Sequence, residues 1–366
     1  MHWAVLAAVV GTFGASVVMT GLVRRWARRT DFVDRPAGHK QHANPTPLGG
    51  GIAITWTLCG SLLAGTFAVW LAHQQGWTPQ LPELLRLHAP GIASRLPNVL
   101  ALVGGALVLH IVGWADDRRP MGPGVKFLVQ FLVAAVLVVG FGMRVAEFLG
   151  APLAIGLSIL WIVLIINAFN FLDNMDGLNA GVAAISAAIL ASAAMRNGQV
   201  FVPTVAWALV GTLLGFLVFN FSPASIFMGD AGSLVVGYFL AMLSVLTTYQ
   251  EYDPARGVVP YGVLMPVVVL AVPLYDVISV VIVRLRAGDS PFRGDRRHFS
   301  HRLTRRGMTP RAAVLTIYLA TMATSLAALQ LPGATWLTAL LVLTQTLCVV
   351  LIIAILEGRP PTFPRR

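Results

Sequence analysis

Long apolar runs separated by short polar loops make up almost the whole chain. Because a bilayer core is crossed by about 20 apolar residues of helix, the pattern predicts an all-α, polytopic integral membrane protein with about eleven transmembrane helices. The eleven runs cover residues 2–23, 49–71, 97–114, 125–142, 150–169, 178–195, 201–220, 231–248, 258–284, 311–330 and 334–356. The run at 258–284 holds Pro260, Pro266 and Pro273, which predicts a kink or break in that helix.

The basic residues fall mostly in alternate loops. If the loop after the first run is cytoplasmic, 21 of the 26 Lys and Arg residues lie on the cytoplasmic side. Positive charge marks the cytoplasmic loops of membrane proteins. We therefore expect the N-terminus outside, the C-terminus in the cytoplasm and an odd number of spans.

Composition supports a membrane protein. Hydrophobic residues make up 57% and charged residues 11% of the chain, whereas soluble domains carry roughly 25% charged residues. The net charge of +11 follows from the cytoplasmic loops and indicates no nucleic-acid partner. Cys59 and Cys348 lie in apolar runs, which excludes a disulfide scaffold. We expect one transmembrane domain at 1–356 and a basic cytoplasmic tail at 357–366.

The first apolar run has no basic segment before it, and an arginine cluster follows it. A cleaved signal peptide has the opposite order of charges. We therefore expect this run to stay in the protein as a spanning helix.

Polar side chains recur every third residue at the end of the fifth run. They are Asn167, Asn170, Asp173 and Asp176, and Gly177 follows them. On a helix that spacing places consecutive members side by side, and glycine is a common helix stop. Carboxylates beside amides suit a hard cation or a polar substrate. The plainer alternative is a solvated helix end.

The loop at 113–126 carries an adjacent acidic pair, Asp116 and Asp117, before Lys126. Adjacent side chains point in different directions, so the two carboxylates are expected to play different parts. Lys126 suits a phosphate as a point charge. The alternative is a charged loop that simply follows the distribution of basic residues.

Asp230 lies between Gly229 and Gly232, just before another apolar run. The glycines would let a backbone approach a ligand closely, whereas the alternative is that Asp230 caps a helix. The orientation set by Lys and Arg alone places Asp230 and the four earlier aspartates on the cytoplasmic side. This convergence predicts a single cytoplasmic site.

The long basic loop at 284–307 contains His298 and His301 at a spacing of three, with Arg297 and Arg302 beside them. Neighbouring cations disfavour protonation of the histidines and binding of a divalent metal. Phosphate is the better ligand, because such a cluster offers several charge-assisted donors. A surface patch for anionic lipid is the alternative.

The segment 35–51 is expected to be structural. Its glycines at 49–51 suit close helix packing, and Arg35, His39 or Lys40 would contact a phosphate. This contact is a secondary expectation.

Asp276 lies inside the ninth run. An intramembrane carboxylate is a functional candidate by default. The equal alternative is that it pairs with a neighbouring helix.

These features together indicate phosphate chemistry at a membrane surface. Mg²⁺ typically takes one or two carboxylates plus phosphate oxygens of the substrate. The basic groups would hold phosphates, and the site is open to both cytosol and lipid. Transfer of a phosphorylated group to a lipid phosphate needs this set, with nucleophile and leaving group held in line.

Four motifs resemble those of the polyprenyl-phosphate N-acetylhexosamine-1-phosphate transferases, glycosyltransferase family 4. They are D-D-R-R-P, N-A-F-N-F-L-D-N-M-D-G-L, F-M-G-D-A-G-S and H-F-S-H-R-L, in family order, and the similarity covers about residues 1–355. The family includes bacterial UDP-GlcNAc:undecaprenyl-phosphate transferases and phospho-MurNAc-pentapeptide transferases.

The resemblance implies a multi-pass enzyme of the bacterial plasma membrane with its active site facing the cytoplasm. A lipid phosphate, undecaprenyl phosphate, would attack the β-phosphorus of a UDP-N-acetylhexosamine and release UMP. The product would start a lipid-linked cell-envelope glycan. Mg²⁺, or Mn²⁺ in its place, would be the cofactor, and a homodimer is compatible with the resemblance.

The resemblance also assigns roles by motif position. Asp116 would deprotonate or position the lipid phosphate, with Asp117 beside it and Lys126 in the same catalytic group. Asn170 and Asp230 would be the metal ligands. The substrate-binding residues would be Asn167, Asp173, Asp176, His298, His301 and Arg302, with Asp173 and Asp176 lining the nucleotide pocket and the two histidines and the arginine contacting phosphates.

Two departures favour UDP-GlcNAc as the donor. The muramoyl branch typically has consecutive histidines in the last loop and ten spans, whereas this chain has H-F-S-H-R-L and eleven expected spans. Direct attack is favoured over a covalent aspartyl intermediate because the two carboxylates are adjacent. The remaining alternatives are the muramoyl donor, a transporter with an anion site, and a structural or lipid-binding membrane protein.

Overall fold

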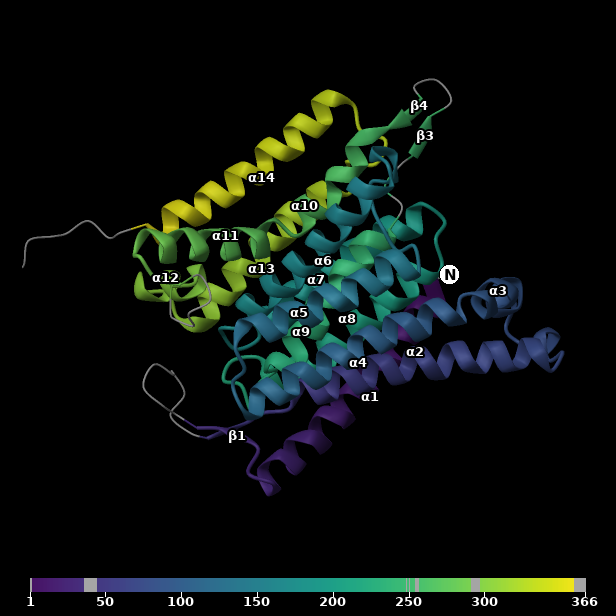
Figure 1. The fold of residues 1–366 in the computed structure, drawn as a ribbon, viewed down its shortest axis with the longest axis horizontal. Coiled ribbons are helices and arrows are strands. Elements are labelled where there is room, and N and C mark those ends of the chain that lie inside the picture. Colours follow the sequence, from purple (N-terminus) through teal and green to yellow (C-terminus); the bar gives the residue numbers. More distant parts are fainter. Residues whose placement is uncertain are drawn as a thin grey trace, which may run out of the picture.

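The computed structural model describes residues 2–35, 45–247, 249, 251–253, 257–290 and 297–358. The fold is all-α, as the sequence predicts (Figure 1). The helices are α1 (His2–Arg29), α2 (Gly50–Gln74), α3 (Glu83–Ser94), α4 (Leu96–Arg118), α5 (Pro123–Ala135), α6 (Ala151–Leu172), α7 (Leu178–Arg196), α8 (Phe201–Asn220), α9 (Asp230–Leu246), α10 (Met265–Val269), α11 (Ala271–Arg286), α12 (Phe299–Arg305), α13 (Pro310–Ala328) and α14 (Trp336–Glu357). Two short antiparallel hairpins complete the fold, one of β1 (Val33–Asp34) with β2 (Thr46–Pro47) and one of β3 (Glu251–Asp253) with β4 (Gly257–Val259).

Each of the eleven predicted runs coincides with a helix or a helix pair. Within the described residues, nine helices are long and apolar enough to cross a membrane. The bent pair formed by α10 and α11 brings the number to ten, and α9 is a shorter apolar helix. The polytopic membrane fold is therefore confirmed, whereas the count of eleven spans and the orientation of the termini stay predictions.

The predicted break in the ninth run lies at Leu270. The segments on either side, Tyr261–Val269 and Ala271–Arg286, meet at a bend of 64°. Pro273 stands in the first turn of α11, where the missing amide hydrogen of proline is tolerated. Hydroxyl Oγ of Ser325 donates to the carbonyl of Val269 at 3.3 Å, so a neighbouring helix satisfies a carbonyl left over at the break.

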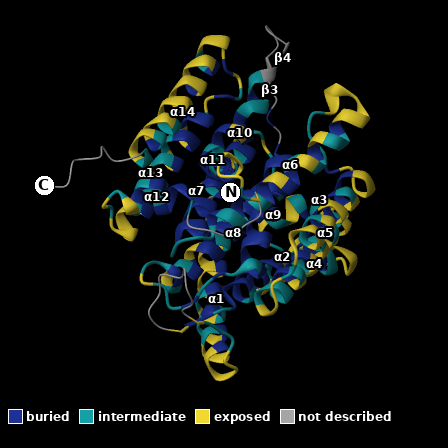
Figure 2. Ribbon diagram, turned by 60° about the vertical axis from the view of Figure 1, so that its left-hand side comes forward, coloured by how far each residue is buried: buried dark blue, intermediate teal, exposed yellow. Residues whose placement is uncertain are grey.

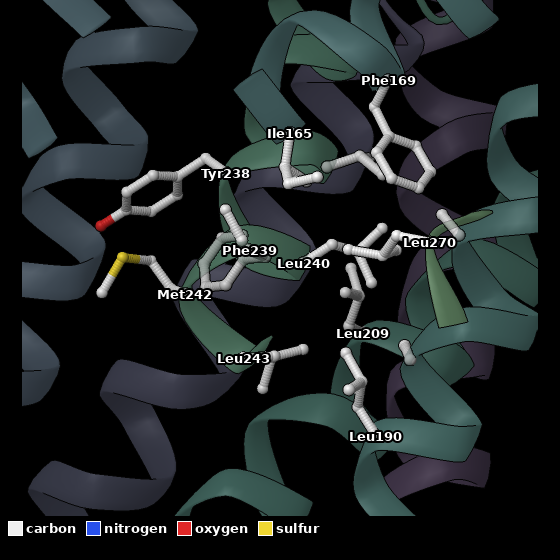
Figure 3. Packing of buried hydrophobic residues seen from close by; sticks show 14 of the residues in the cluster. Ile165, Phe169, Leu190, Leu209, Tyr238, Phe239, Leu240, Met242, Leu243 and Leu270 are labelled. Atoms are coloured by element: carbon white, nitrogen blue, oxygen red, sulfur yellow. The ribbon is translucent and has the colours of Figure 1, made fainter. Parts of the chain in front are cut away.

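Helix α9 forms the centre of the bundle, packed by α2, α4, α6 and α7. Every residue from Ala231 to Val245 is buried. Figure 3 shows Phe239 and Leu243 of α9 in the same buried cluster as Leu209 of α8 and Leu190 of α7. In Figure 2 buried residues fill the middle of the bundle, and exposed ones gather on peripheral helices such as α14. The core is thus built around one short helix.

Glycines bring two neighbouring helices against the first turn of α9. A Cβ at Gly51 of α2 would lie 2.2 Å from the backbone nitrogen of Gly232. A Cβ at Gly113 of α4 would lie 2.4 Å from the carbonyl oxygen of Asp230. Both distances are shorter than any real contact, so only glycine fits. The close packing predicted for residues 49–51 is confirmed, and it fixes the place where α9 begins.

The helix ends that carry the predicted cytoplasmic residues gather at one end of the bundle (Figure 1). The C-terminal ends of α1, α11 and α14 lie there together with α12, whereas α3 and the β3–β4 hairpin lie at the opposite end. The convergence inferred from charge distribution therefore has a structural counterpart.

Candidate active site

The carboxylate of Asp117 caps α9 from a different helix. Its Oδ1 accepts a hydrogen bond from the backbone N–H of Asp230 at 2.8 Å, and its Oδ2 accepts one from Ala231 at 3.1 Å. These first-turn donors have no partner within their own helix, and a negative charge is favourable at that end. Gly229 precedes them with φ +70°, and a Cβ there would lie 2.6 Å from Asp117. The N-cap residue is Gly229, so the alternative role of Asp230 as the cap is wrong.

Lys126 bridges two carboxylates. Its Nζ donates to Asp116 Oδ2 at 3.0 Å and to Asp230 Oδ2 at 2.8 Å. The other oxygen of Asp116 accepts from the backbone N–H of Met121 at 2.7 Å. Asp116 and its neighbour in the sequence therefore have different partners, as expected for adjacent side chains.

Asn170 joins the last turns of α6 to the same group. Its side-chain nitrogen donates to Asp230 Oδ1 at 3.0 Å and to the hydroxyl of Ser233 at 2.9 Å. Ser233 was missed in the sequence, although its position three residues after Asp230 places it beside that side chain on a helix.

The polar segment after α6 is a turn and not a continuing helix. The expectation of one helix from Asn167 to a stop at Gly177 is wrong, because α6 ends at Leu172. Asn174 donates to the carbonyl of Phe171 at 2.8 Å, and such local side-chain bonds compete with helix. Gly177, with φ +75°, begins α7.

Asp173 and Asp176, placed on the helix by the sequence, lie in that turn. Asp176 accepts a hydrogen bond from the backbone N–H of Ala224 at 2.9 Å. Its contact with a nucleotide stays a prediction.

The electrostatics of Asp173 indicate an excess of negative charge. Burial raises the pKa of its carboxyl well above the usual value, and the carboxylates of Asp230 and Asp117 raise it further, while a hydrogen bond from the backbone of Gly229 acts in the opposite direction. Lys126, which pairs with Asp230 and Asp116, supplies one positive charge to this group of carboxylates. A bound cation would balance the remainder.

The donor set fits a cation that is completed by its substrate. Among the described residues, no group of three or more His, Cys, Asp or Glu side chains has the arrangement of a metal site. Asn170 and Asp230, the predicted ligands, lie side by side and offer one amide and one carboxylate. Mg²⁺ commonly binds through one or two protein ligands, water and substrate phosphates. The metal itself stays a prediction.

The histidine helix α12 is anchored by the intramembrane carboxylate. Asp276 is fully buried, and its Oδ2 lies 2.8 Å from His298 Nδ1. Its Oδ1 accepts from the backbone N–H of Phe299 at 3.2 Å. The sequence left two readings of Asp276 open, and the structure shows that it pairs with another segment. It fixes the orientation of one predicted phosphate-binding histidine.

The end of α6 connects the histidine helix to the carboxylates. The rings of Phe171 and His298 meet edge to face, with centroids 5.8 Å apart. The hydroxyl of Ser300 donates to Asn174 Oδ1. Phe171 is the neighbour of Asn170, so the end of α6 touches both the acidic cluster and the histidine helix.

Arg302 lies behind this site. Its guanidinium donates to Ser279 at 2.7 Å and lies 3.1 Å from Glu357 Oε2, while the hydroxyl of Tyr275 donates to Glu357 Oε1 at 2.6 Å. These contacts fasten α12 to α11 and α14. Contacts of Arg302 and His301 with a phosphate stay predictions. Glu357 was missed, although it is the only Asp or Glu after Asp295 in the sequence.

Two residues with expected substrate or phosphate contacts lie away from the cluster. The side-chain nitrogen of Asn167 donates to Gln130 and, at 2.8 Å, to the carbonyl of Val163, so its substrate role stays a prediction. Arg35 is exposed and pairs with Asp31. His39 and Lys40 lie outside the described residues, as does the tail beyond residue 358.

The apolar helical bundle, with a polar cluster built from several helices at one end, defines a multi-pass membrane protein. Residues 99–248 match glycosyl transferase family 4.

The chain is also similar to three named transferases. A probable undecaprenyl-phosphate N-acetylglucosaminyl 1-phosphate transferase of Bacillus subtilis is 32% identical over 88% of this chain and 83% of its own length. A decaprenyl-phosphate N-acetylglucosaminephosphotransferase of Mycobacterium leprae is 36% identical over 85% and 80%. An undecaprenyl-phosphate alpha-N-acetylglucosaminyl 1-phosphate transferase of Escherichia coli is 27% identical over 85% and 80%. The chain belongs to glycosyl transferase family 4.

Proposed function

We propose that the protein transfers N-acetylglucosamine 1-phosphate from UDP-GlcNAc to undecaprenyl phosphate in a bacterial plasma membrane. The observation that carries this proposal is the cluster in which Lys126 bridges Asp116 and Asp230 beside Asn170. Three relatives that cover most of the chain are named as transferases of this kind. Their names give the acceptor as undecaprenyl or decaprenyl phosphate and the transferred group as N-acetylglucosamine phosphate.

The carboxylates of the cluster have different roles in the proposed transfer. Asp116 faces Lys126 and positions the incoming lipid phosphate or takes its remaining proton. Asn170 and Asp230 would hold Mg²⁺, or Mn²⁺ in its place, which neutralises charge on the donor pyrophosphate when bound. Asp173 and Asp176, in the turn before α7, would face the nucleotide.

The chemistry is a single displacement. An oxygen of the lipid phosphate forms a bond to the β-phosphorus of UDP-GlcNAc as the bond from that phosphorus to the UMP oxygen breaks. Both oxygens of Asp117 are occupied by backbone donors of α9, which supports a positioning part for this residue rather than a nucleophilic one. Direct attack by the lipid phosphate needs no covalent aspartyl intermediate.

The histidine helix would bind the phosphates of the donor. Asp276 holds His298 in one orientation, which would fix where its second ring nitrogen meets a phosphate group. His301 and Arg302 would add contacts from the same helix. In this proposal the cation and the acceptor bind at the acidic cluster. The donor phosphates bind between that cluster and α12.

Release of UMP by the purified protein is the direct test. With UDP-GlcNAc, undecaprenyl phosphate and Mg²⁺ we expect release that is lost without lipid or metal and lost in Asp230→Ala. Activity on UDP-MurNAc-pentapeptide but not on UDP-GlcNAc would move the protein to the muramoyl branch. If neither donor gave release of UMP, the result would contradict the proposed reaction.

The active site is proposed to face the cytoplasm. Single cysteines in a protein lacking Cys59 and Cys348, placed at Ser290 and at Asp253, should react with an impermeant maleimide from opposite sides of sealed vesicles. Ser290 should be labelled from the cytoplasmic side, since it lies in the basic loop. Labelling of both from one side would overturn the topology. A homodimer also stays a prediction, for which the mass of the purified complex is the measurement.

A further inference from the structure

A cavity of about 670 Å³ opens at the end of the bundle away from the carboxylates. It lies between α1, α2, α3 and α8 and reaches Leu246, the last residue of α9. Asp230 is the first residue of that helix, so at a rise of about 1.5 Å per residue the two ends lie roughly 24 Å apart. Val99 near the start of α4 lines the cavity, whereas Asp117 lies near the end of the same helix. The cavity is therefore separate from the candidate active site.

The walls of the cavity are mostly apolar. They include Val69 of α2, and Phe201 and Trp207 of α8. Its volume is that of a pocket for a drug-sized molecule. Three of the four helices around it, α1, α2 and α8, are candidate membrane spans, so hydrocarbon chains of the bilayer are the apolar groups with direct access to it.

The ionisable residues of the lining are His88 and Arg95, and neither carries a negative charge. Arg95 is exposed and His88 half-buried, on or next to α3 at the edge of the bundle. No Asp or Glu occurs among the described residues that line the cavity. A membrane phosphate group would meet a favourable charge there, whereas a zwitterionic headgroup would gain less.

We propose that this cavity binds a membrane lipid with an anionic headgroup. One hydrocarbon chain lies against α2 and α8, and the phosphate lies against Arg95 and His88. A soluble anion would leave the apolar wall unused, and a neutral lipid would leave the charge of Arg95 unbalanced.

Two glycines on α2 make a matched pair for the test. Gly65 lines the cavity and Gly60 does not, both are exposed, and neither has an atom within 4 Å of an added Cβ. Gly65→Trp therefore places an indole in the cavity without a clash against the backbone, and Gly60→Trp makes the same change outside it. Arg95→Gln removes the positive charge that would face the lipid headgroup, and Arg86→Gln on α3 is its control.

The experiment measures thermal unfolding of the delipidated full-length protein in detergent. Phosphatidylglycerol, phosphatidylcholine with the same chains, and glycerol 1-phosphate are added in turn. We expect phosphatidylglycerol to raise the midpoint of unfolding by about 4 °C, as for a ligand well above its dissociation constant. The shift with phosphatidylcholine should be smaller, and glycerol 1-phosphate should give none. A photoactivatable phosphatidylglycerol should crosslink to the segment from α3 to the start of α4.

The variants separate a built site from general solvation by lipid. Gly65→Trp should lose most of the shift and the crosslink, and Gly60→Trp should keep both. Arg95→Gln should respond equally to the two phospholipids, while Arg86→Gln behaves like wild type. Equal responses of the two tryptophan variants would overturn the proposal, and so would a full shift with glycerol 1-phosphate. The readouts need no turnover, so they stand apart from the test of transferase activity.

Discussion

At its first turn α9 is surrounded by hydrogen bonds, and at its last residue it borders an apolar cavity. Asp117, Lys126 and Asn170 come from three different helices to the first turn, and Gly51 and Gly113 press two of the neighbouring backbones against it. The opposite end has open space beside Gly65. The difference shows where close packing is needed: carboxylates must be held at fixed separations, whereas a hydrocarbon chain only has to be accommodated.

The largest effect should come from the acidic pair on α4. Asp116→Asn and Asp117→Asn should each lower turnover by about 10³-fold, because each removes charge from a preorganised site. Asp117→Asn should also lower stability by about 1 kcal/mol, since one of its two hydrogen bonds to the start of α9 is lost. UMP release and thermal unfolding measure the two effects.

Asp31→Asn is the control for these variants, because Asp31 is exposed and pairs with Arg35. Turnover and stability should both stay at the wild-type level. A fully active variant at Asp116 or Asp117 would remove that residue from the mechanism.

The second effect concerns the buried anchor of the histidine helix. Asp276→Asn should lower turnover by about 10- to 100-fold, because an imidazole that loses its orientation loses its place beside the phosphate. KM for the UDP-sugar should rise as well, which a defect confined to stability would not produce. Steady-state kinetics at several donor concentrations give this separation.

Asp289→Asn makes the same change of charge nearby, at a partly exposed pair with Arg297. Such surface pairs contribute roughly 0–1 kcal/mol, so kinetics should be unchanged. If both variants behaved alike, the pairing of Asp276 with His298 would have no special part.

The smallest effect tests the packing of α9 directly. Gly51→Ala should destabilise the protein by about 1–3 kcal/mol, the usual cost of an extra group in a filled core. Gly60→Ala, nine residues later on α2 with open space around it, should be neutral or slightly stabilising. Equal midpoints of thermal unfolding in detergent would show that α2 can shift without cost.

Much of the fold was predictable because the apolar residues that indicate each helix lie within that helix's own stretch of sequence. All eleven runs coincide with helices, and the prolines located the break near Leu270. The sequence singled out Asp116, Lys126, Asn170 and Asp230 as candidates, with roles implied by the family resemblance, and the structure brings their side chains together.

Other features depend on contacts between distant segments. The capping of α9 by Asp117 joins residues more than one hundred positions apart, and no local pattern contains it. The end of α6 at Leu172 depends on how the amide of Asn174 turns back to the backbone. The partner of Asp276 could not be identified from the sequence, because the contact depends on how α11 and α12 pack against each other.

The burial of α9 has a consequence for how the protein meets membranes of different thickness. At 17 residues and about 1.5 Å per residue this helix spans roughly 26 Å, less than a hydrocarbon core of about 30 Å. Protein buries every residue from Ala231 to Val245, so this stretch meets no hydrophobic mismatch of its own. Peripheral helices such as α14, which the rest of the protein covers only slightly, can tilt to match a thicker or thinner bilayer. The spacing of the carboxylates at the start of α9 is thereby insulated from changes in lipid chain length.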